Sequence, residues 1–325
     1  MKAIVYDNAG PPGALKLAEI EKPTAGDGEV LINVRAASVN PLDVGLLRHP
    51  FLRRIVSALS KLKNNRPGRD VAGHVEAVGR NVTHFKPGDA VFGWCGGAFA
   101  EYARTSQSKL VMKPDNASFE QAAAVPVAAL TALQGLRDKR KVQPGQKVLI
   151  NGAAGGVGTF AVQIAKSFGA EVTGVCSTRN VAMVRSIGAD HVIDYTKEDF
   201  TKGDQRYDVI FDNVNNHSFS DRRRVLTPNG VCVLAGIGGA GLHPGMLGRV
   251  VGILKANLLS RFVRQKFVRY GTETNKEDLT LLSDLMQTGK VKPVIDRTYK
   301  LSETAEAMRY FEEGHARGKV VLTVD

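Results

Sequence analysis

The sequence predicts an α/β protein in which a strand-rich module is followed by a doubly wound parallel sheet. Short strands separated by turn residues fill the first 112 residues, and strands alternate with helices from about residue 118 onward. A glycine-rich stretch, INGAAGGVGTFAV (150–162), stands at the start of that alternation. Because 325 residues are too many for one ordinary core, we expect two domains.

The first module is predicted to be strands because its apolar runs are bounded by clusters of Gly, Pro, Asn and Asp. The expected strands are KAIVY (2–6), LKLAEI (15–20), EVLINVRAA (29–37), DVAGHVEAV (70–78), DAVFGW (89–94), AFAEYA (98–103) and KLVMK (109–113). KPGD (86–89) predicts a Pro-Gly turn that leads into one of them. We therefore expect an all-β module, interrupted by a basic stretch near 50–65.

The second module alternates between strands and helices. The expected strands are 147–152, 171–176, 191–195, 207–214 and 230–237, with helices over 160–168 and 182–187. Alternation of this kind predicts a parallel, doubly wound sheet. The C-terminal part is expected to form helices at 275–289 and 302–314 and a final strand at 318–324.

The glycine-rich stretch has the features that a dinucleotide site needs. Gly155 and Gly158 match the second and third glycines of G-x-G-x-x-G, and Ala153 takes the first place. Such a turn lets the backbone approach a pyrophosphate, which then faces the N–H groups at the start of the next helix. The strand–turn–helix–strand context favours dinucleotide binding over the alternative, a tight turn without a ligand.

The end of the next strand discriminates between the two nicotinamide cofactors. CSTRN (176–180) offers Ser177 and Arg179 and no acid, whereas an NAD site has Asp or Glu at this point. A hydroxyl and a guanidinium bind a 2′-phosphate, which a carboxylate would repel. The sequence therefore favours NADP(H) over NAD(H), with a solvated residue at a helix start as the alternative for Arg179.

Seven motifs along the chain resemble those of the zinc-free quinone oxidoreductases of the medium-chain dehydrogenase/reductase family, and the tail and CSTRN are most similar to chloroplast-envelope-type homologues. They are EVLINVRAASVNPLD (29–43), GRDVAGHVEAVG (68–79), FKPGDAVFG (85–93), AAAVPVAALTAL (122–133), NGAAGGVG (151–158), VRSIGADHVIDY (184–195) and GHARGKVVL (314–322). The resemblance implies a GroES-like β-barrel catalytic domain plus a Rossmann domain. The expected limits are 1–120 for the catalytic domain, 121–265 for the cofactor domain, and 266–325 for a return segment completing the catalytic domain.

The resemblance also implies the site residues. Asn40 and Asp43 of NPLD and Thr131 of ALTAL are the expected catalytic residues, beside the nicotinamide. The expected cofactor-binding residues are Ala153, Gly155, Gly156, Val157, Gly158, Ser177, Arg179, Tyr195, Ala235, Gly236, Ile237 and Lys319. The alternatives are a turn residue for Asn40, helix packing for Thr131 and a solvated strand-start residue for Lys319.

Zinc ligands are missing from the positions that hold zinc in alcohol dehydrogenases of this superfamily. The first position falls in ASVNPLD, with Ser38 and Asn40, and the His-Glu position falls in GRDVAG, with Asp70 and Val71. Tetrahedral zinc needs three or four converging ligands, and three cysteines cannot supply a four-cysteine lobe. His74 lies in an alternating strand, where packing or hydrogen bonding is the commoner role. We expect no metal.

The implied activity is the NADPH-dependent reduction of a quinone, or of the C=C bond of an α,β-unsaturated carbonyl, by hydride transfer. These substrates need less activation than a plain ketone, whose reduction without a Lewis acid is disfavoured. Two alternatives remain open. One is a metal-free alcohol dehydrogenase or aldehyde reductase, and the other is a weakly catalytic NADPH-binding peripheral membrane protein.

Two basic segments, 48–69 and 249–269, hold seven and six Lys/Arg and no acid, so the remainder of this +12 chain is nearly neutral. Apolar residues at helical spacing run through both, which fits helices that cap the cleft or bind an anionic membrane face. No nucleic-acid motif accompanies them, so we expect no nucleic acid partner. Without a long apolar run or a signal peptide pattern, the expected compartment is the cytoplasm. KFVRYGT (266–272) is a candidate edge strand for a homodimer.

Overall fold

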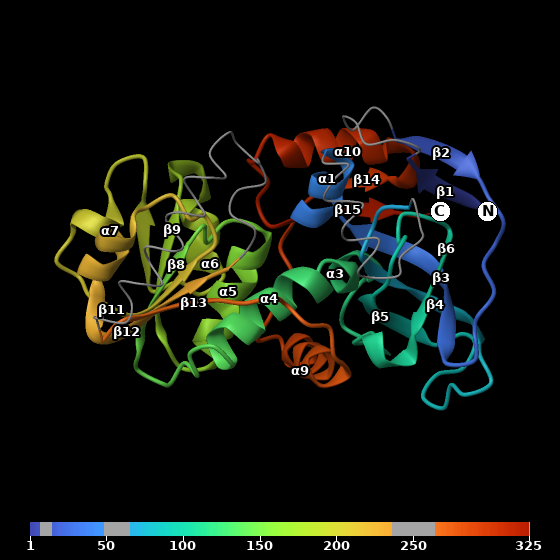
Figure 1. Cartoon of the computed structure of the whole chain (residues 1–325), viewed down its shortest axis with the longest axis horizontal. Helices are drawn as coiled ribbons and strands as arrows, with labels where there is room; N and C mark the ends of the chain where they lie inside the picture. Colours follow the sequence, from blue (N-terminus) through green and yellow to red (C-terminus); the bar gives the residue numbers. More distant parts are fainter. Residues whose placement is uncertain (7–14, 49–65, 236–263, 325) are drawn as a thin grey trace. The chain divides into compact units, whose positions relative to one another are not determined.

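Two large sheets with their covering helices organise the chain in a computed structural model (Figure 1). The structure describes residues 1–6, 15–48, 66–235 and 264–324. The chain divides into a first unit, Met1–Leu130 with Glu273–Asp325, and a second unit, Thr131–Thr272. The first unit is therefore built from both ends of the sequence, and the second from its middle.

Within the described residues, the first unit has a seven-stranded sheet in the order β14-β15-β3-β4-β5-β7, with β6 paired to β3, and a small β1-β2 sheet. The strands are β1 (Lys2–Val5), β2 (Lys16–Glu19), β3 (Glu29–Ser38), β4 (Asp70–Val78), β5 (Ala90–Trp94), β6 (Tyr102–Ser106), β7 (Leu110–Met112), β14 (Ile295–Lys300) and β15 (Lys319–Thr323). The C-terminal β15 runs antiparallel to β3, with Val321 opposite Ser38. This pairing brings the start of β15 to the polar end of β3.

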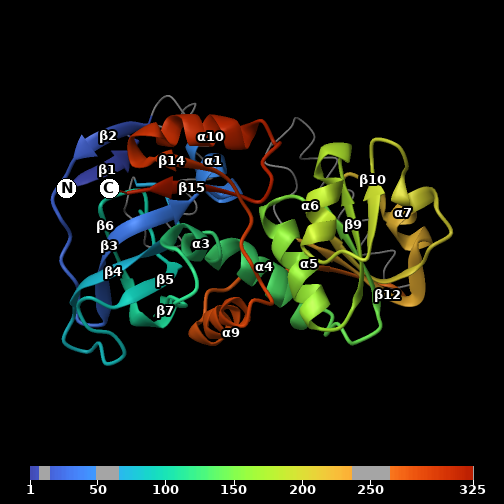
Figure 2. The same ribbon diagram turned by 180° about the vertical axis from the view of Figure 1, so that it is seen from behind.

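The helices of the first unit are α1 (Pro41–Arg48), α3 (Phe119–Ala123), α9 (Lys276–Gln287) and α10 (Thr304–Glu312), and α4 (Pro126–Arg137) spans the division between the units. Side chains fix several helix starts. Ser118 and Gln121 form a capping box at α3, and Asn275 accepts a hydrogen bond from the backbone N–H of Asp278 at α9. The apolar face of α10 packs on β15 (Figure 2), which closes the core of this unit.

The second unit has a parallel sheet in the order β10-β9-β8-β11-β12-β13. Its strands are β8 (Lys147–Asn151), β9 (Glu171–Cys176), β10 (His191–Asp194), β11 (Tyr207–Asp212), β12 (Leu226–Leu234) and β13 (Lys266–Arg269), and its helices are α5 (Gly156–Ser167), α6 (Val181–Ser186) and α7 (Phe219–Arg224). The strand order reverses between β8 and β11. In such sheets, ligands bind outside the carboxyl ends of the strands at this reversal.

The structure confirms the predicted fold class and the alternating strands of the second unit. The expectation of an all-β first module is wrong at α1, where Pro41 occupies the first helical position and Asp43 lies in the first turn, both favourable at a helix start. Helix α5 begins at Gly156, four residues before the expected start. Among the described strands, β13 lies at the edge of its sheet, as expected, and its bonds to β12 place it in the second unit, beyond the expected domain limit at 265.

Candidate functional site

A buried polar cluster lies in the first unit, where β3 ends and β4 and β15 begin. The carboxylate of Asp70 is fully buried and is its centre. Asp70 Oδ2 accepts hydrogen bonds from Ser38 Oγ at 2.7 Å and Asn40 Nδ2 at 2.8 Å, and Oδ1 accepts one from the backbone N–H of Val127 at 2.9 Å. The side chain therefore joins two strands to the start of α4, within the first unit.

The ammonium of Lys319 enters the same cluster from β15. Its Nζ donates to Asn40 Oδ1 at 2.7 Å and to the carbonyl oxygen of Val39 at 3.2 Å, and it lies 3.4 Å from Asp70 Oδ2. Lys319 is 3% exposed, so the alternative of a solvated strand-start lysine is wrong. Burial lowers the pKa of its ammonium, while the negative charge of Asp70 opposes that shift.

Asp43 is a second buried carboxylate, at the start of α1. Its Oδ2 accepts from the backbone N–H of Asn40 at 3.0 Å, its Oδ1 accepts from that of Gly68 at 3.3 Å, and Arg69 Nε lies 3.8 Å away. Burial raises the pKa of the Asp43 carboxyl to about 6, against the opposing effects of Arg69 and the two N–H groups. Asp43 thus fixes the NPLD turn, and the pKa of its carboxyl lies above the usual range for aspartate.

The carboxamide of Asn40 is held at both ends. Its Nδ2 donates to Asp70 Oδ2 and, at 3.3 Å, to the carbonyl oxygen of Ser38, while its Oδ1 accepts from Lys319. Asn40 is only 2% exposed. Such a group suits the positioning of the turn and its charges better than direct capture of a substrate.

These residues do not fit a zinc ion. Ser38, Asn40 and Asp70 converge as the zinc positions would, but the oxygens of Asn40 and Asp70 face the Lys319 ammonium, a fixed cation. Among residues 1–6, 15–48, 66–235 and 264–324, no group of three His, Cys, Asp or Glu side chains could hold a metal ion. His74 is exposed, its Nδ1 lies 3.2 Å from the carbonyl oxygen of Gly88, and its ring packs edge-on against Phe119.

Thr131, expected as a catalytic residue, lies at the boundary of the second unit. Its hydroxyl hydrogen-bonds to that of Thr272 at 2.9 Å, and its carbonyl oxygen accepts from the Tyr270 hydroxyl. The side chain is largely buried, at 8% exposed. The expected helix-packing role and the expected cofactor role both fit this position.

The glycine-rich turn in the second unit joins β8 to α5. Gly152 has a φ of +84°, a conformation that favours glycine, and a Cβ on Gly158 would lie 2.0 Å from the carbonyl oxygen of Gly152. A Cβ on Gly155 would instead have as its nearest neighbour the Gly152 oxygen, at 3.6 Å. Gly152 and Gly158 therefore build the turn, while Gly155, at the helix N-cap, leaves open space there. A phosphate fits this position, because the first N–H groups of a helix lack internal partners.

The other cofactor-binding residues of this turn follow from the same geometry. Ala153 is buried against β9 and donates its backbone N–H to the carbonyl oxygen of Val175 at 3.0 Å. Gly156 and Val157 open α5. The turn is thus held to two strands of the sheet, which fixes the direction of the N–H groups at the helix start.

The carboxyl ends of β9 and β10 bring Ser177, Arg179 and Tyr195 to one edge of the sheet. Ser177 Oγ accepts from Asn180 Nδ2 at 3.1 Å, Arg179 is exposed, and Tyr195 is 61% exposed. Asp194 also lies here. Its carboxylate accepts hydrogen bonds from the Thr178 and Thr196 hydroxyls, which lower its pKa. This acid is therefore already bonded, and the recognition of a 2′-phosphate by Ser177 and Arg179 stays a prediction.

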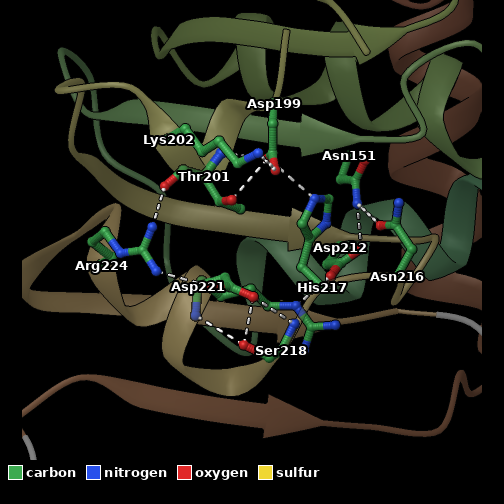
Figure 3. Close-up of polar contacts among 11 residues, drawn as sticks. Asn151, Asp199, Thr201, Lys202, Asp212, Asn216, His217, Ser218, Asp221 and Arg224 are labelled. Atoms are coloured by element: carbon green, nitrogen blue, oxygen red, sulfur yellow. Dashed lines mark hydrogen bonds and ion pairs between the residues drawn. The ribbon is translucent and has the colours of Figure 1, made fainter. Parts of the chain in front are cut away.

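The carboxyl end of β11 carries a polar network that sequence reasoning missed (Figure 3). Asp212 is fully buried, forms an ion pair with Arg222 at 2.7 Å, and accepts from Asn151 Nδ2 at 2.9 Å, which also donates to Asn216 Oδ1. Asp212 Oδ1 also accepts from the backbone N–H of Asn215 at 2.9 Å. The network holds the loop after β11 beside the loop after β8, at the reversal of the strand order.

Asn215 is the unusual member of this loop. Its φ is +60°, which few residues other than glycine adopt, and its Nδ2 reaches the carbonyl oxygen of Ala235 at 3.4 Å. Its Oδ1 is buried and finds no hydrogen-bond partner among the described residues. Ala235 is an expected cofactor residue, while Gly236 and Ile237 lie outside the described residues. The NVNN sequence after β11 offers an excess of amide side chains, a signal that could have identified this loop.

The comparisons with known proteins agree with this geometry. Two family profiles match, "Alcohol dehydrogenase GroES-like domain" over residues 26–115 and "Zinc-binding dehydrogenase" over residues 187–322. The chain is 34% identical to Quinone-oxidoreductase QR1, chloroplastic, of Triphysaria versicolor, covering 99% of this chain and 98% of that protein. It is 35% identical to the NADPH-dependent alkenal/one oxidoreductase, chloroplastic, of Arabidopsis thaliana, covering 99% of this chain and 79% of the relative.

A solved structure, the quinone oxidoreductase from Coxiella burnetii, superposes with a TM-score of 0.85 at 32% identity, covering 100% of this chain and 99% of the other. Its similarity extends over both units. Together with the full-length relatives and the two profiles, it shows that the chain belongs to the medium-chain dehydrogenase/reductase family, among relatives that include quinone oxidoreductases.

Proposed function

We propose that the protein is an NADPH-dependent oxidoreductase that reduces quinones or the C=C bond of α,β-unsaturated carbonyls without zinc. The observation that carries this proposal is the turn at Gly152–Gly158, built tightly at two glycines and left open at Gly155. The family implies a pyridine nucleotide, and the names of the relatives point to quinones and alkenals. When bound, the nicotinamide would supply the hydride.

The residues of the second unit would hold the cofactor. The backbone at Ala153, Gly155, Gly156, Val157 and Gly158 would take the pyrophosphate, and Ser177, Arg179 and Tyr195 the 2′-phosphate end. Ala235 and Thr131 would lie toward the nicotinamide. We add Asn215, whose unpaired Oδ1 can accept a hydrogen bond from a cofactor hydroxyl or amide.

The residues of the first unit would organise the catalytic side. Lys319 places an ammonium between Asn40 and Asp70, which supports zinc independence because a second cation there would meet like charge. Lys319 thus acts as a positioning residue in this proposal, in place of the expected cofactor contact. Asp43 holds the NPLD turn, and burial raises the pKa of its carboxyl to about 6.

The test is nucleotide binding and turnover by the purified protein. We expect NADPH to bind more tightly than NADH, and Arg179→Gln to abolish most of that preference. Gly155→Ala should leave the melting temperature unchanged, since its methyl group has room, yet weaken NADPH binding by filling the open space at the helix start. No change in fluorescence or melting temperature with saturating NADPH or NADH would refute the proposal.

Substrate class is tested by NADPH oxidation with quinones, alkenals and plain aldehydes. Turnover of quinones or alkenals supports the proposal. Turnover of plain aldehydes alone would favour a metal-free aldehyde reductase, and binding without turnover would favour a nucleotide-binding protein with little activity. A metal assay of the purified protein checks zinc independence, which stoichiometric zinc would contradict.

Further partners follow from the same reasoning. The position of β13 at the edge of the sheet, among the described strands, supports a homodimer through the second unit. Membrane contact through 48–69 and 249–269 stays a prediction, because both segments lie mainly outside the described residues. Within the described ranges, no helix combines the length and the apolar character needed to cross a bilayer.

A further inference from the structure

We propose that the second unit binds a phosphate group at a site separate from the glycine-rich turn. The site is a hollow of about 700 Å³ at the edge of the parallel sheet where the strands begin. Its lining residues are Arg206, Ser220, Arg223, Arg224, Leu226, Pro228, Arg264 and Gln265. The lining therefore contains four arginines and no acidic residue.

The four arginines come from three separate segments. Arg206 directly precedes β11, Arg223 and Arg224 end α7, and Arg264 lies just before β13. They converge because parallel strands begin at the same edge of a sheet. The helix dipole accounts for basic residues in the last turn of α7, but it does not account for Arg206 or Arg264.

Two of the guanidinium groups are fixed by hydrogen bonds. Arg206 NH1 donates to the carbonyl oxygens of Gly203, Asp204 and Gln205, the shortest of these bonds being 2.9 Å. Arg224 donates to the carbonyl oxygen of Thr201 at 3.2 Å and to Asp221 at 3.0 Å (Figure 3). These bonds use one nitrogen of Arg206 and two of Arg224, so each side chain keeps N–H groups for a ligand.

The charge around the hollow is not balanced. Asp221 pairs with Arg224 and caps α7, while the guanidinium groups of Arg223 and Arg264 have no hydrogen bond or ion pair to a side chain or carbonyl within the described part of the chain. Like charges around one hollow repel, and a shared anion relieves that repulsion. Several converging guanidinium groups match the oxygens of a phosphate, to which each can donate twice.

This site lies at the opposite end of the strands from the turn proposed to hold the dinucleotide. The glycine-rich turn follows the carboxyl end of β8, whereas Arg206 and Arg264 precede the amino ends of β11 and β13. Its ligand is thus a second phosphate-bearing molecule, either a free organic or inorganic phosphate or the headgroup of an anionic phospholipid.

The test uses the full chain with NADPH present, so that the dinucleotide site is filled. Diphosphate is titrated by calorimetry at constant ionic strength against wild type, Arg223→Gln/Arg264→Gln, and the control Arg80→Gln/Arg309→Gln. The control removes the same charge from the first unit. We expect saturable binding that the first double variant weakens by roughly tenfold or more, because charge-assisted hydrogen bonds are lost, and that the control leaves unchanged.

Flotation with vesicles distinguishes the source of the phosphate. Binding to phosphatidylcholine vesicles containing phosphatidylglycerol, but not to phosphatidylcholine alone, with loss in Arg223→Gln/Arg264→Gln, identifies a lipid headgroup. Diphosphate binding without flotation identifies a soluble ligand. Absence of both, or binding retained by Arg223→Gln/Arg264→Gln, overturns the proposal. Because the variants leave the glycine-rich turn intact, a loss of diphosphate affinity in Arg223→Gln/Arg264→Gln but not in the control identifies the arginine site whether or not NADPH binds.

Discussion

Replacing Asn215 by glycine tests whether the loop after β11 contacts the cofactor. A buried acceptor left unpaired costs about 1–3 kcal/mol, and a ligand that bonds to it recovers that cost. Asn215→Gly removes the unpaired oxygen, so the variant cannot make this gain on binding. We expect the Kd for NADPH to rise about tenfold, which corresponds to about 1.4 kcal/mol.

The unliganded variant should be about as stable as the wild type. Glycine adopts the +60° φ of this residue freely, and losing the unpaired oxygen is favourable. Against this, the long hydrogen bond from Nδ2 to Ala235 is lost, and the greater freedom of glycine in the unfolded chain costs about 0.4–1 kcal/mol. Fluorescence titration with NADPH measures the affinity, and thermal unfolding without NADPH measures the stability. A loss of affinity at constant melting temperature would identify a binding role.

Lys141→Gly is the matched control. Among the described residues, Lys141 and Asn215 are the two non-glycine residues with a positive φ, which is +55° for Lys141. Lys141 follows α4 and lies in the second unit, as Asn215 does. The substitution makes the same backbone change away from the reversal of the strand order between β8 and β11, so the Kd should stay within about twofold of wild type, a difference of roughly 0.4 kcal/mol. Equal affinities of wild type and Asn215→Gly would show that the unpaired oxygen faces no ligand.

Three further predictions concern the glycine-rich turn and the buried polar residues of the first unit. Gly158→Ala should lower the free energy of unfolding by about 1–3 kcal/mol, and with it the melting temperature, because its methyl group would lie 2.0 Å from the Gly152 carbonyl oxygen. An unchanged melting temperature would contradict this close packing. Lys319→Met should lower the free energy of unfolding by about 3–5 kcal/mol, measured by urea unfolding, because it leaves Asp70 without its cation. Adding Asp70→Asn should restore part of that stability. The pKa of Asp43 is about 6 in the folded protein against 3.8 in the unfolded chain, so its stabilising contribution is complete below about pH 4 and falls by roughly 3 kcal/mol as pH rises through 6. The melting temperatures of wild type and Asp43→Asn, measured by thermal unfolding, should therefore diverge across this pH window. Melting temperatures that change in parallel with pH would contradict the raised pKa.

Much of the second unit could be predicted because its signals are local. The strand at Glu171–Cys176 has the predicted limits, since an unbroken apolar run is typical of a strand covered on both faces. The glycine-rich turn was found for the same reason, because its close contact between Gly158 and Gly152 spans only six residues. The predicted start of the next helix, residue 160, lies four residues after the observed start at Gly156, because glycines at the start of the helix hide its apolar periodicity.

The first unit could be predicted only in part because its site depends on contacts far apart in sequence. Lys319 and Asn40 are separated by 279 residues, and no local pattern tells a buried ammonium from a solvated one. The helix at Pro41–Arg48 was missed since it is short and follows a strong strand. The amide-rich sequence of the loop at Asn215 does not reveal that the Asn215 oxygen is unpaired, because that depends on neighbours known only from the structure.

The pairing of β15 with β3 has a consequence for the order of synthesis and folding. During translation, the middle of the chain emerges whole, and Thr131–Thr272 forms a compact unit of its own, so it can fold while the ribosome is still at work. The N-terminal strands must wait for the last strand to be released before the ammonium of Lys319 can neutralise Asp70. Loss of the last seven residues, which include Lys319, would therefore leave the end of β3 without its pairing strand and Asp70 without its cation.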